Sequence, residues 1–277
     1  MKTKLFKNPS LQKAFDKDGF VVVNMLSPNE VEGLKKEVAK LDNEHVRYTN
    51  NSSYKLSFFS DDPKYRKLVF DTIYTFCRPI VDRFLEDYDP IIVNTFNKEV
   101  GTGEVPIHQN WSFVDESKHT SVSVWIPLID TTKTNGTMEV VKGSHAVLTP
   151  YRGPSIPWVF QDLFEVIKNK HMTAIDAKLG QAVILDDSII HYTSRNDSDT
   201  GRSTVQLIMK PKSAPAIHYH RSADNANYLE VFEVNSDFFT RFQMGERPAG
   251  VPKIAEIPFR ENRFTEMEML DRIRNRA

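Results

Sequence analysis

The chain has almost no cysteine, no long apolar run and no excess of charge of either sign. Cys77 is the single cysteine among 277 residues, so an intramolecular disulfide is excluded. No segment approaches the length of a membrane span, and the N-terminus lacks the apolar stretch of a secretory signal. We therefore expect a cytoplasmic protein that does not have a membrane as a partner.

The charges balance to a formal net charge of −1, from 36 Lys+Arg against 37 Asp+Glu. Such a balance gives no overall field that would attract nucleic acid. Hydrophobic residues make up 40% and charged residues 26%, which is typical of a globular protein able to bury a core. The length fits a single domain over 1–277. We divide it into a helical N-terminal part over about 1–88, a core of short strands over about 89–215 and a C-terminal extension over about 216–277.

Helix signals surround one strand in the first ninety residues. Ser27-Pro28-Asn29-Glu30 combines an N-cap, a proline for the first turn and a capping-box glutamate, and predicts a helix over about 28–42. A second helix is predicted over about 63–85, and Pro79 should kink or divide it. The valine-rich run at 20–23 predicts a strand buried on both faces. The amphipathic stretch 256–274 suits the outside of the core or an oligomer interface, so a homo-oligomer stays open.

From residue 90 onward the sequence changes to short strands. We predict them at 91–96, 121–128, 137–141, 173–177, 182–185 and 203–209. Asn135-Gly136 predicts a type I′ turn, and a helical insertion is expected near 150–171. Because no strand–helix–strand alternation is present, the pattern favours a mainly β sandwich or jelly roll with flanking helices.

Two histidines and an arginine form the chief candidate site. Histidines far apart in sequence, such as His108 and His191, can meet at the mouth of a jelly roll. Two imidazoles and one carboxylate bind Fe(II) in many non-haem sites, and Asn110 stands where the carboxylate is expected. Arg202 begins a strand, and its guanidinium could grip a carboxylate bidentately. Each residue alone has a simpler interpretation, as a strand-end histidine or a surface ion pair.

Several segments together resemble the phytanoyl-CoA dioxygenase family of Fe(II)/2-oxoglutarate-dependent oxygenases. They are DGFVV at 18–22, HQNW at 108–111, WIPLID at 125–130, NGTMEVVKGSH at 135–145, and the stretch from His191 through Asn196 and Ser198 to Arg202. The resemblance implies a double-stranded β-helix, which is a cupin-like jelly roll.

The same resemblance implies roles for individual residues. His108 and His191 look like metal ligands, with Asn110 at the position of the third. Arg202, Thr193 and Trp125 look like residues that contact 2-oxoglutarate. The implied reaction uses O₂ to hydroxylate an unactivated C–H bond of a small organic substrate, and converts 2-oxoglutarate to succinate and CO₂.

Asn110 departs from the family pattern, because an amide is a neutral and weaker donor than a carboxylate. It could still bind the metal in a working or impaired enzyme. Alternatively, the chain is a metal-poor small-molecule binding protein, or an engineered Asp-to-Asn inactive variant. A halogenase with an anion at this position is less favoured, because asparagine leaves less room than glycine or alanine. Nearby acids could supply a substitute carboxylate, although turn roles explain them better: Asp115, Glu116, Asp186 and Asp187.

Aromatic residues flank the first histidine. Phe96, Trp111 and Phe113 could line a substrate pocket, although aromatic side chains beside strands more often belong to the core. His218 and His220 share one face of a strand, and we assign them to the surface or a pocket rim. Lys98 could attract an anionic substrate such as a carboxylate, although a solvated lysine is the simpler interpretation.

Overall fold

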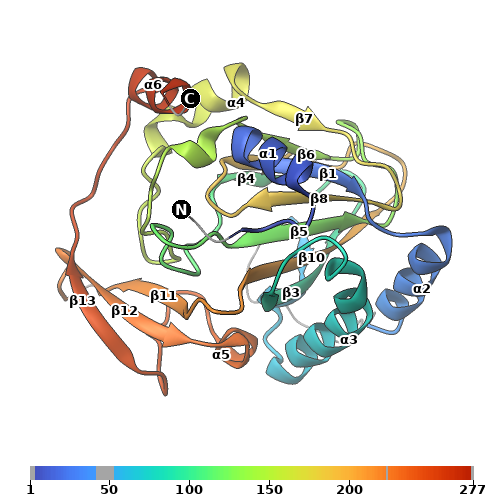
Figure 1. Cartoon of the computed structure of the whole chain (residues 1–277), viewed down its shortest axis with the longest axis horizontal. Coiled ribbons are helices and arrows are strands. Elements are labelled where there is room, and N and C mark those ends of the chain that lie inside the picture. Colours follow the sequence, from blue (N-terminus) through green and yellow to red (C-terminus); the bar gives the residue numbers. More distant parts are fainter. Residues whose placement is uncertain (1–3, 42–52, 223, 276–277) are drawn as a thin grey trace.

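Two antiparallel sheets face each other in the computed structural model, which describes residues 4–41, 53–222 and 224–275. The larger sheet has six strands in the order β1 (Phe20–Asn24), β8 (Gln181–Asp186), β5 (Val122–Pro127), β10 (Arg202–Pro211), β3 (Tyr88–Lys98) and β2 (Lys55–Leu56). The smaller has four, in the order β4 (Val105–His108), β9 (His191–Thr193), β6 (Met138–Val140) and β7 (Thr173–Ile175). The fold is thus mainly β, a jelly roll with flanking helices, as predicted (Figure 1).

Helices pack on the outer faces. α1 (Pro9–Asp18), α2 (Pro28–Ala39) and α3 (Pro63–Val81) contribute to the cluster beneath the six-stranded sheet. α4 (Phe164–Lys170) and α6 (Glu266–Arg274) share a cluster with residues of the four-stranded sheet. The amphipathic C-terminal stretch therefore covers the outside of the jelly roll, where Met269 of α6 is fully buried. No helix in the described ranges is both long enough and apolar enough to cross a bilayer.

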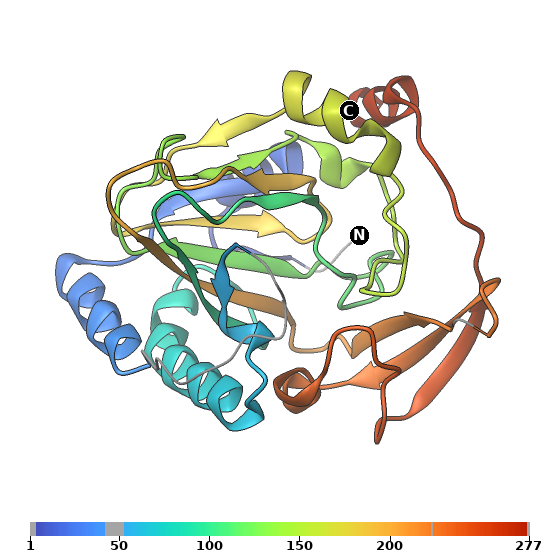
Figure 2. The same ribbon diagram turned by 180° about the vertical axis from the view of Figure 1, so that it is seen from behind.

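A third sheet stands beside the jelly roll. It consists of β11 (Ala216–Arg221), β12 (Tyr228–Val234) and β13 (Lys253–Pro258), with α5 (Ser236–Arg241) between the last two. Figure 2 shows it from behind, together with the long segment that leads from β13 to α6. Its inner side chains join Ile92 and Phe113 in one apolar cluster, which ties this sheet to the end of β3.

Strand alternation decides which side chains face the interior. On β5, Val122, Val124 and Ile126 pack toward the helices. The intervening Trp125 joins the cluster between the two sheets, which also contains Val183 of β8 and residues of β6 and β7. β10 alternates in the same way, with Val205, Leu207 and Met209 beneath the helices. Arg202 and Gln206 consequently lie on the interior side, because successive residues of a strand point to opposite faces.

Three details of the sequence-based prediction are wrong. The strand at 20–23 is not buried on both faces: β1 is an edge strand whose Val22 is 37% exposed. Pro79 does not divide α3, which passes it and ends two residues later, at Val81 instead of about residue 85. Asn135-Gly136 is not a type I′ turn. That turn needs positive φ at both positions, and Asp87 is the only non-glycine residue with positive φ among the described residues. The turn instead joins strands of different sheets, and Gly136 adopts φ 74° where a side chain would meet the Ser194 carbonyl.

Candidate metal centre and its cavity

The two candidate histidines lie directly opposite each other on paired strands. β4 and β9 are antiparallel with His108 opposite His191, and their ring centroids are 4.1 Å apart. The Nδ1 atom of His108 lies 2.8 Å from the Pro106 carbonyl, and that of His191 lies 2.9 Å from the Ile189 carbonyl. These contacts assign the proton to Nδ1 in both rings. Each Nε2 then offers its lone pair, which is the arrangement found for histidines that bind a metal.

The charge state of both rings suits metal binding. Burial lowers the pKa of His108. Burial, together with the neighbouring His108 ring, holds the pKa of His191 well below its ordinary value. Both imidazoles are therefore neutral at physiological pH, and the neutral ring is the form that binds a metal ion.

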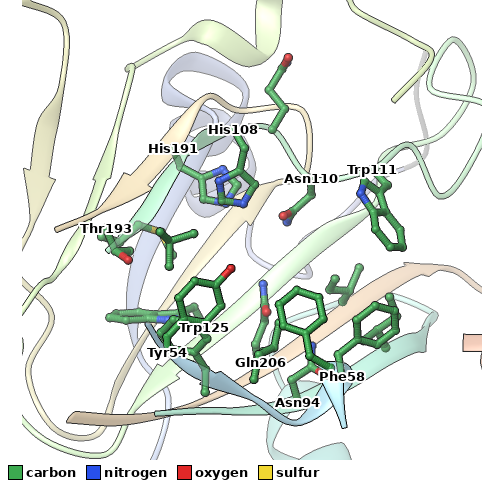
Figure 3. A pocket seen from close by; sticks show the side chains of 18 of the residues that line it. Tyr54, Phe58, Asn94, His108, Asn110, Trp111, Trp125, His191, Thr193 and Gln206 are labelled. Carbon is green, nitrogen blue, oxygen red and sulfur yellow. The ribbon is translucent and has the colours of Figure 1, made fainter. Parts of the chain in front are cut away.

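Asn110 extends from the segment after β4 toward the two rings (Figure 3). Its Nδ2 donates to Asp187 Oδ1 at 2.8 Å and to Ser123 Oγ at 3.0 Å. Both contacts are made by Nδ2, so Oδ1 is the end of the amide that faces away from Asp187. Asp187 itself is fully buried, and burial raises its pKa to about 7 against the lowering effect of the Asn110 hydrogen bond.

No carboxylate takes the third ligand position. Within 4–41, 53–222 and 224–275, no three His, Cys, Asp or Glu side chains are grouped closely enough to hold a metal ion. The acids considered as substitutes have other contacts. Asp115 accepts from Ser117, Asp186 accepts from Ser188, and Glu116 forms a buried ion pair with Arg152. The Asn110 side chain is thus the polar group that extends toward the two imidazoles in place of a carboxylate.

Arg202 is buried behind the cavity with an unusual lack of partners. Its side chain is 0% exposed, and none of its three guanidinium nitrogens has a hydrogen-bond partner among the described residues. The guanidinium carbon lies 5.5 Å from the centre of the Phe96 ring and 5.4 Å from that of Trp125. Burial lowers the pKa of Arg202 to about 9. An unpaired buried cation is costly, so this arrangement favours an anionic ligand such as a carboxylate.

Lys98 is buried, so its interpretation as a solvated lysine is wrong, and it becomes a functional candidate. It is 1% exposed, and its Nζ donates to Thr193 Oγ1 at 2.6 Å and to the Ser194 carbonyl at 2.5 Å. Burial and the nearby Arg202 lower the pKa of Lys98 to about 6. A signal was available in the sequence: Lys98 follows Phe96 at the two-residue spacing that places both on the inner face of β3.

A second missed group holds the backbone around Asn110. Arg152 donates from Nε to the Asn110 carbonyl at 2.6 Å, and its other nitrogens bind the Glu116 carboxylate at 2.8 and 2.5 Å. Both side chains are less than a tenth exposed. Nothing in the sequence pairs these two residues, which lie 36 positions apart.

The histidines open onto a cavity of about 360 Å³. Trp125 and Thr193 lie on one side, and Trp111 and Phe58 on the other (Figure 3). Phe96, Trp111 and Phe113 all lie on its wall, and Phe113 also belongs to an apolar cluster of the core. None of the described lining residues carries a formal charge; the polar ones besides the candidate ligands include Asn94, Gln109 and Gln206.

His218 and His220 are not surface residues. His218 is 2% exposed and packs among Trp111, Phe238 and Phe242, with ring centroids 6.0, 5.6 and 4.9 Å away. Burial, with a contribution from His220, lowers its pKa to about 4. His218 therefore supports the aromatic wall from behind as a neutral ring.

The sequence model of the family described as phytanoyl-CoA dioxygenase (PhyH) matches residues 15–204, which is well over half of the chain. The chain belongs to the phytanoyl-CoA dioxygenase family. A relative described as phytanoyl-CoA dioxygenase domain-containing protein 1 homolog, from Dictyostelium discoideum, is 26% identical over 118 residues, covering 40% of this chain and 42% of the relative. The match thus spans less than half of the length of that curated relative.

Solved structures share the fold at low sequence identity. The carbocyclase SnoK of nogalamycin biosynthesis, described as non-heme and alpha-ketoglutarate dependent, has a TM-score of 0.53 and 16% identity, covering 76% of this chain and 86% of SnoK. EctD from S. alaskensis with bound Fe has a TM-score of 0.51 and 18% identity, covering 76% of this chain and 79% of EctD. These likenesses support the jelly-roll fold.

Proposed function

We propose that this protein is an Fe(II)/2-oxoglutarate-dependent oxygenase. His108, His191 and the amide oxygen of Asn110 would hold the metal, and Arg202, Thr193 and Trp125 would hold the co-substrate. The observation that carries the proposal is the buried guanidinium of Arg202, which has no hydrogen-bond partner among the described residues. It packs over the rings of Phe96 and Trp125, which line the cavity that the two imidazoles share. Family membership agrees with it, as do the fold relatives described with bound Fe or as dependent on alpha-ketoglutarate.

The site's own residues would each perform a physical task. The Nδ1 contacts fix both imidazole rings, so that a metal meets two preoriented lone pairs. Arg202 would pair with the distal carboxylate of 2-oxoglutarate through two parallel hydrogen bonds, and Lys98 would hold Thr193 in place beside it. Bound iron, with 2-oxoglutarate and O₂, supplies the oxidation of a substrate C–H bond and yields succinate and CO₂. The aromatic wall excludes water from that reaction.

The cavity indicates a neutral, largely apolar small molecule as the substrate. Its wall is mostly aromatic and aliphatic, and the amides of Asn94 and Gln206 supply polar contacts. A volume of about 360 Å³ suits a small ligand. A highly charged substrate would lose hydration there without gaining an ion pair. We therefore favour hydroxylation of a neutral molecule over reaction on a phosphate-bearing carrier within this cavity.

Halogenation is disfavoured by the surroundings of Asn110. A halide at the third ligand position would have to displace the Asn110 side chain, which two hydrogen bonds hold in place. It would also lie near Asp187, whose ionised form repels an anion.

The proposal is tested by adding Fe(II) and 2-oxoglutarate to the protein without oxygen. We expect a visible charge-transfer absorption, and succinate after air is admitted. His191→Ala should abolish the absorption. His171→Ala is a matched control, because His171 bonds Glu266 in the α4–α6 region and is not one of the cavity-lining residues. If the unaltered protein gives neither absorption nor succinate, it is a small-molecule binding protein on the same scaffold.

A further inference from the structure

Asn110, Ser123 and Asp187 form one hydrogen-bonded group beside the candidate metal ligands, and we call it the amide–carboxylate group. Asp187 Oδ1 accepts from Asn110 Nδ2 at 2.8 Å and from Ser123 Oγ at 2.7 Å. Ser123 Oγ in turn accepts from Asn110 Nδ2 at 3.0 Å. Asp187 and Ser123 are both 0% exposed, whereas Asn110 is partly buried and lines the cavity.

The carboxylate determines which way the amide faces. Were the amide turned by 180°, its oxygen would lie against Asp187 Oδ1 at hydrogen-bond distance, and two acceptors would repel each other. The observed orientation directs Nδ2 toward both acceptors and turns Oδ1 away from Asp187. A metal ion between the imidazoles would therefore meet an oxygen and not an N–H group.

We propose that Asp187 is a positioning residue that acts on the metal site through Asn110. Its negative charge replaces the charge that the family's carboxylate ligand would carry. This inference rests on the proposed function. Hydrogen bonding of an amide N–H to a carboxylate shifts electron density toward the amide oxygen and makes it a better metal donor. A bound cation nearby would favour the ionised form of Asp187. In that form, two neutral imidazoles, an amide and one carboxylate together carry the same formal charge as two imidazoles and a carboxylate ligand.

The backbone keeps Asp187 in this supporting position. Asp187 lies in the turn that leads from β8 to His191, and its N–H donates to the Ser121 carbonyl at 3.2 Å. Asn110 is held independently, because Arg152 binds its carbonyl. Ser123 is fixed on β5 and also accepts from Gln206 Nε2 at 3.3 Å. Three separate segments thus converge, and Asp187 contacts the amide without replacing it as the ligand.

The test is titration of the protein with Co(II) alone, followed by visible absorption and by competition with a chelator. We expect Asp187→Asn to weaken Co(II) binding at least about tenfold, the effect typical of lost support to a metal ligand. Asp186→Asn is the matched control: it removes the same charge one residue earlier, where the carboxylate binds Ser188. Its Co(II) affinity should stay within about twofold of the unaltered protein, because it does not touch Asn110.

Exchanging the side chains at positions 110 and 187 distinguishes a loss of negative charge from a folding defect as the cause of weaker Co(II) binding. The double variant Asn110→Asp/Asp187→Asn keeps one carboxylate and one amide in contact and should recover the affinity that Asp187→Asn loses. Asn110→Asp alone should bind Co(II) less tightly than the double variant, because its new carboxylate lies against that of Asp187 and the two negative charges repel each other.

Three results would overturn the inference. Equal Co(II) affinity in Asp187→Asn and the unaltered protein would show that the carboxylate has no role at the metal. Failure of the exchange to restore binding would make Asp187 a purely structural residue. An unaltered protein that binds no Co(II) would remove the proposed function and this inference with it, whereas the first two results leave the proposed function standing.

Discussion

Arg202→Met should stabilise the ligand-free protein while it abolishes the response to 2-oxoglutarate. Methionine is apolar and flexible enough to occupy the space between the Phe96 and Trp125 rings. The substitution removes a cation that has no hydrogen-bond partner among the residues described. A residue that binds a ligand can lower the stability of the protein when that ligand is absent. Arg202 fits this description because its charge is buried without a hydrogen-bond partner among the described residues.

The magnitude follows from the burial of the guanidinium. Burial lowers the pKa of Arg202 from its ordinary value to about 9, and this change corresponds to roughly 5 kcal/mol against the charged form. The contacts with the two aromatic rings return about 1 kcal/mol each. The difference is a gain of about 3 kcal/mol in the free energy of unfolding for Arg202→Met.

Urea unfolding with and without 2-oxoglutarate measures both effects. At a concentration of one hundred times Kd, the co-substrate should stabilise the metal-loaded unaltered protein by about 2.7 kcal/mol and Arg202→Met not at all. Arg66→Met is a suitable control for the ligand response. Arg66 is also a buried arginine with unpartnered nitrogens, but its Nη1 donates to the Phe242 carbonyl away from the cavity.

Two outcomes would refute the reasoning on Arg202. A ligand-free Arg202→Met protein that unfolds at lower urea than the unaltered protein would mean that the guanidinium is not an uncompensated charge. A normal response of this variant to 2-oxoglutarate would mean that the carboxylate binds elsewhere.

Two further predictions concern the same cavity and its support. Arg202→Lys should keep the charge but lose one of the two parallel hydrogen bonds, and weaken 2-oxoglutarate about tenfold or more in calorimetric titrations; equal affinity would remove Arg202 from its role. His218→Phe should flatten the pH dependence of stability. The pKa of His218 in the folded protein is about 4, so below pH 6.5 the unfolded chain takes up a proton that the folded chain refuses. The unaltered protein should therefore lose up to roughly 3 kcal/mol between about pH 6.5 and about pH 4, and the variant should lose correspondingly less. If urea unfolding at several pH values shows the same loss of unfolding free energy in His218→Phe as in the unaltered protein, this prediction is wrong.

The inward placement of the site could be predicted from strand periodicity. The alternation on β5 and β10 sends the aliphatic residues toward the helices, so the remaining positions, among them Trp125 and Arg202, must face the interior. The pairing of His108 with His191 also agrees with a jelly roll, in which distant strand ends meet. These features follow from periodicity and fold class, which a single sequence carries.

Other features depended on geometry that periodicity does not encode. The periodicity of β3 places Lys98 on the inner face with Phe96, but most lysine side chains in proteins are exposed, and only the structure shows that Lys98 is 1% exposed. The end of α3 illustrates the same limit. Pro79 sits in the last turn of the helix, where few later hydrogen bonds remain to be lost, and the sequence pattern alone did not fix where that last turn falls.

The contact between Asn110 and Asp187 shows why a ligand position cannot be judged from one residue. The two side chains are 77 positions apart, and Asp187 lies in a turn whose acids have ordinary local roles, as Asp186 does with Ser188. Judged from the sequence alone, Asn110 lacks the negative charge that a carboxylate at this position would carry. In the structure a fully buried carboxylate lies 2.8 Å from its amide nitrogen, and burial strengthens the electrostatic interactions of that carboxylate. A metal ion responds to the summed charge and orientation of its surroundings, so the relevant unit for this site is the pair.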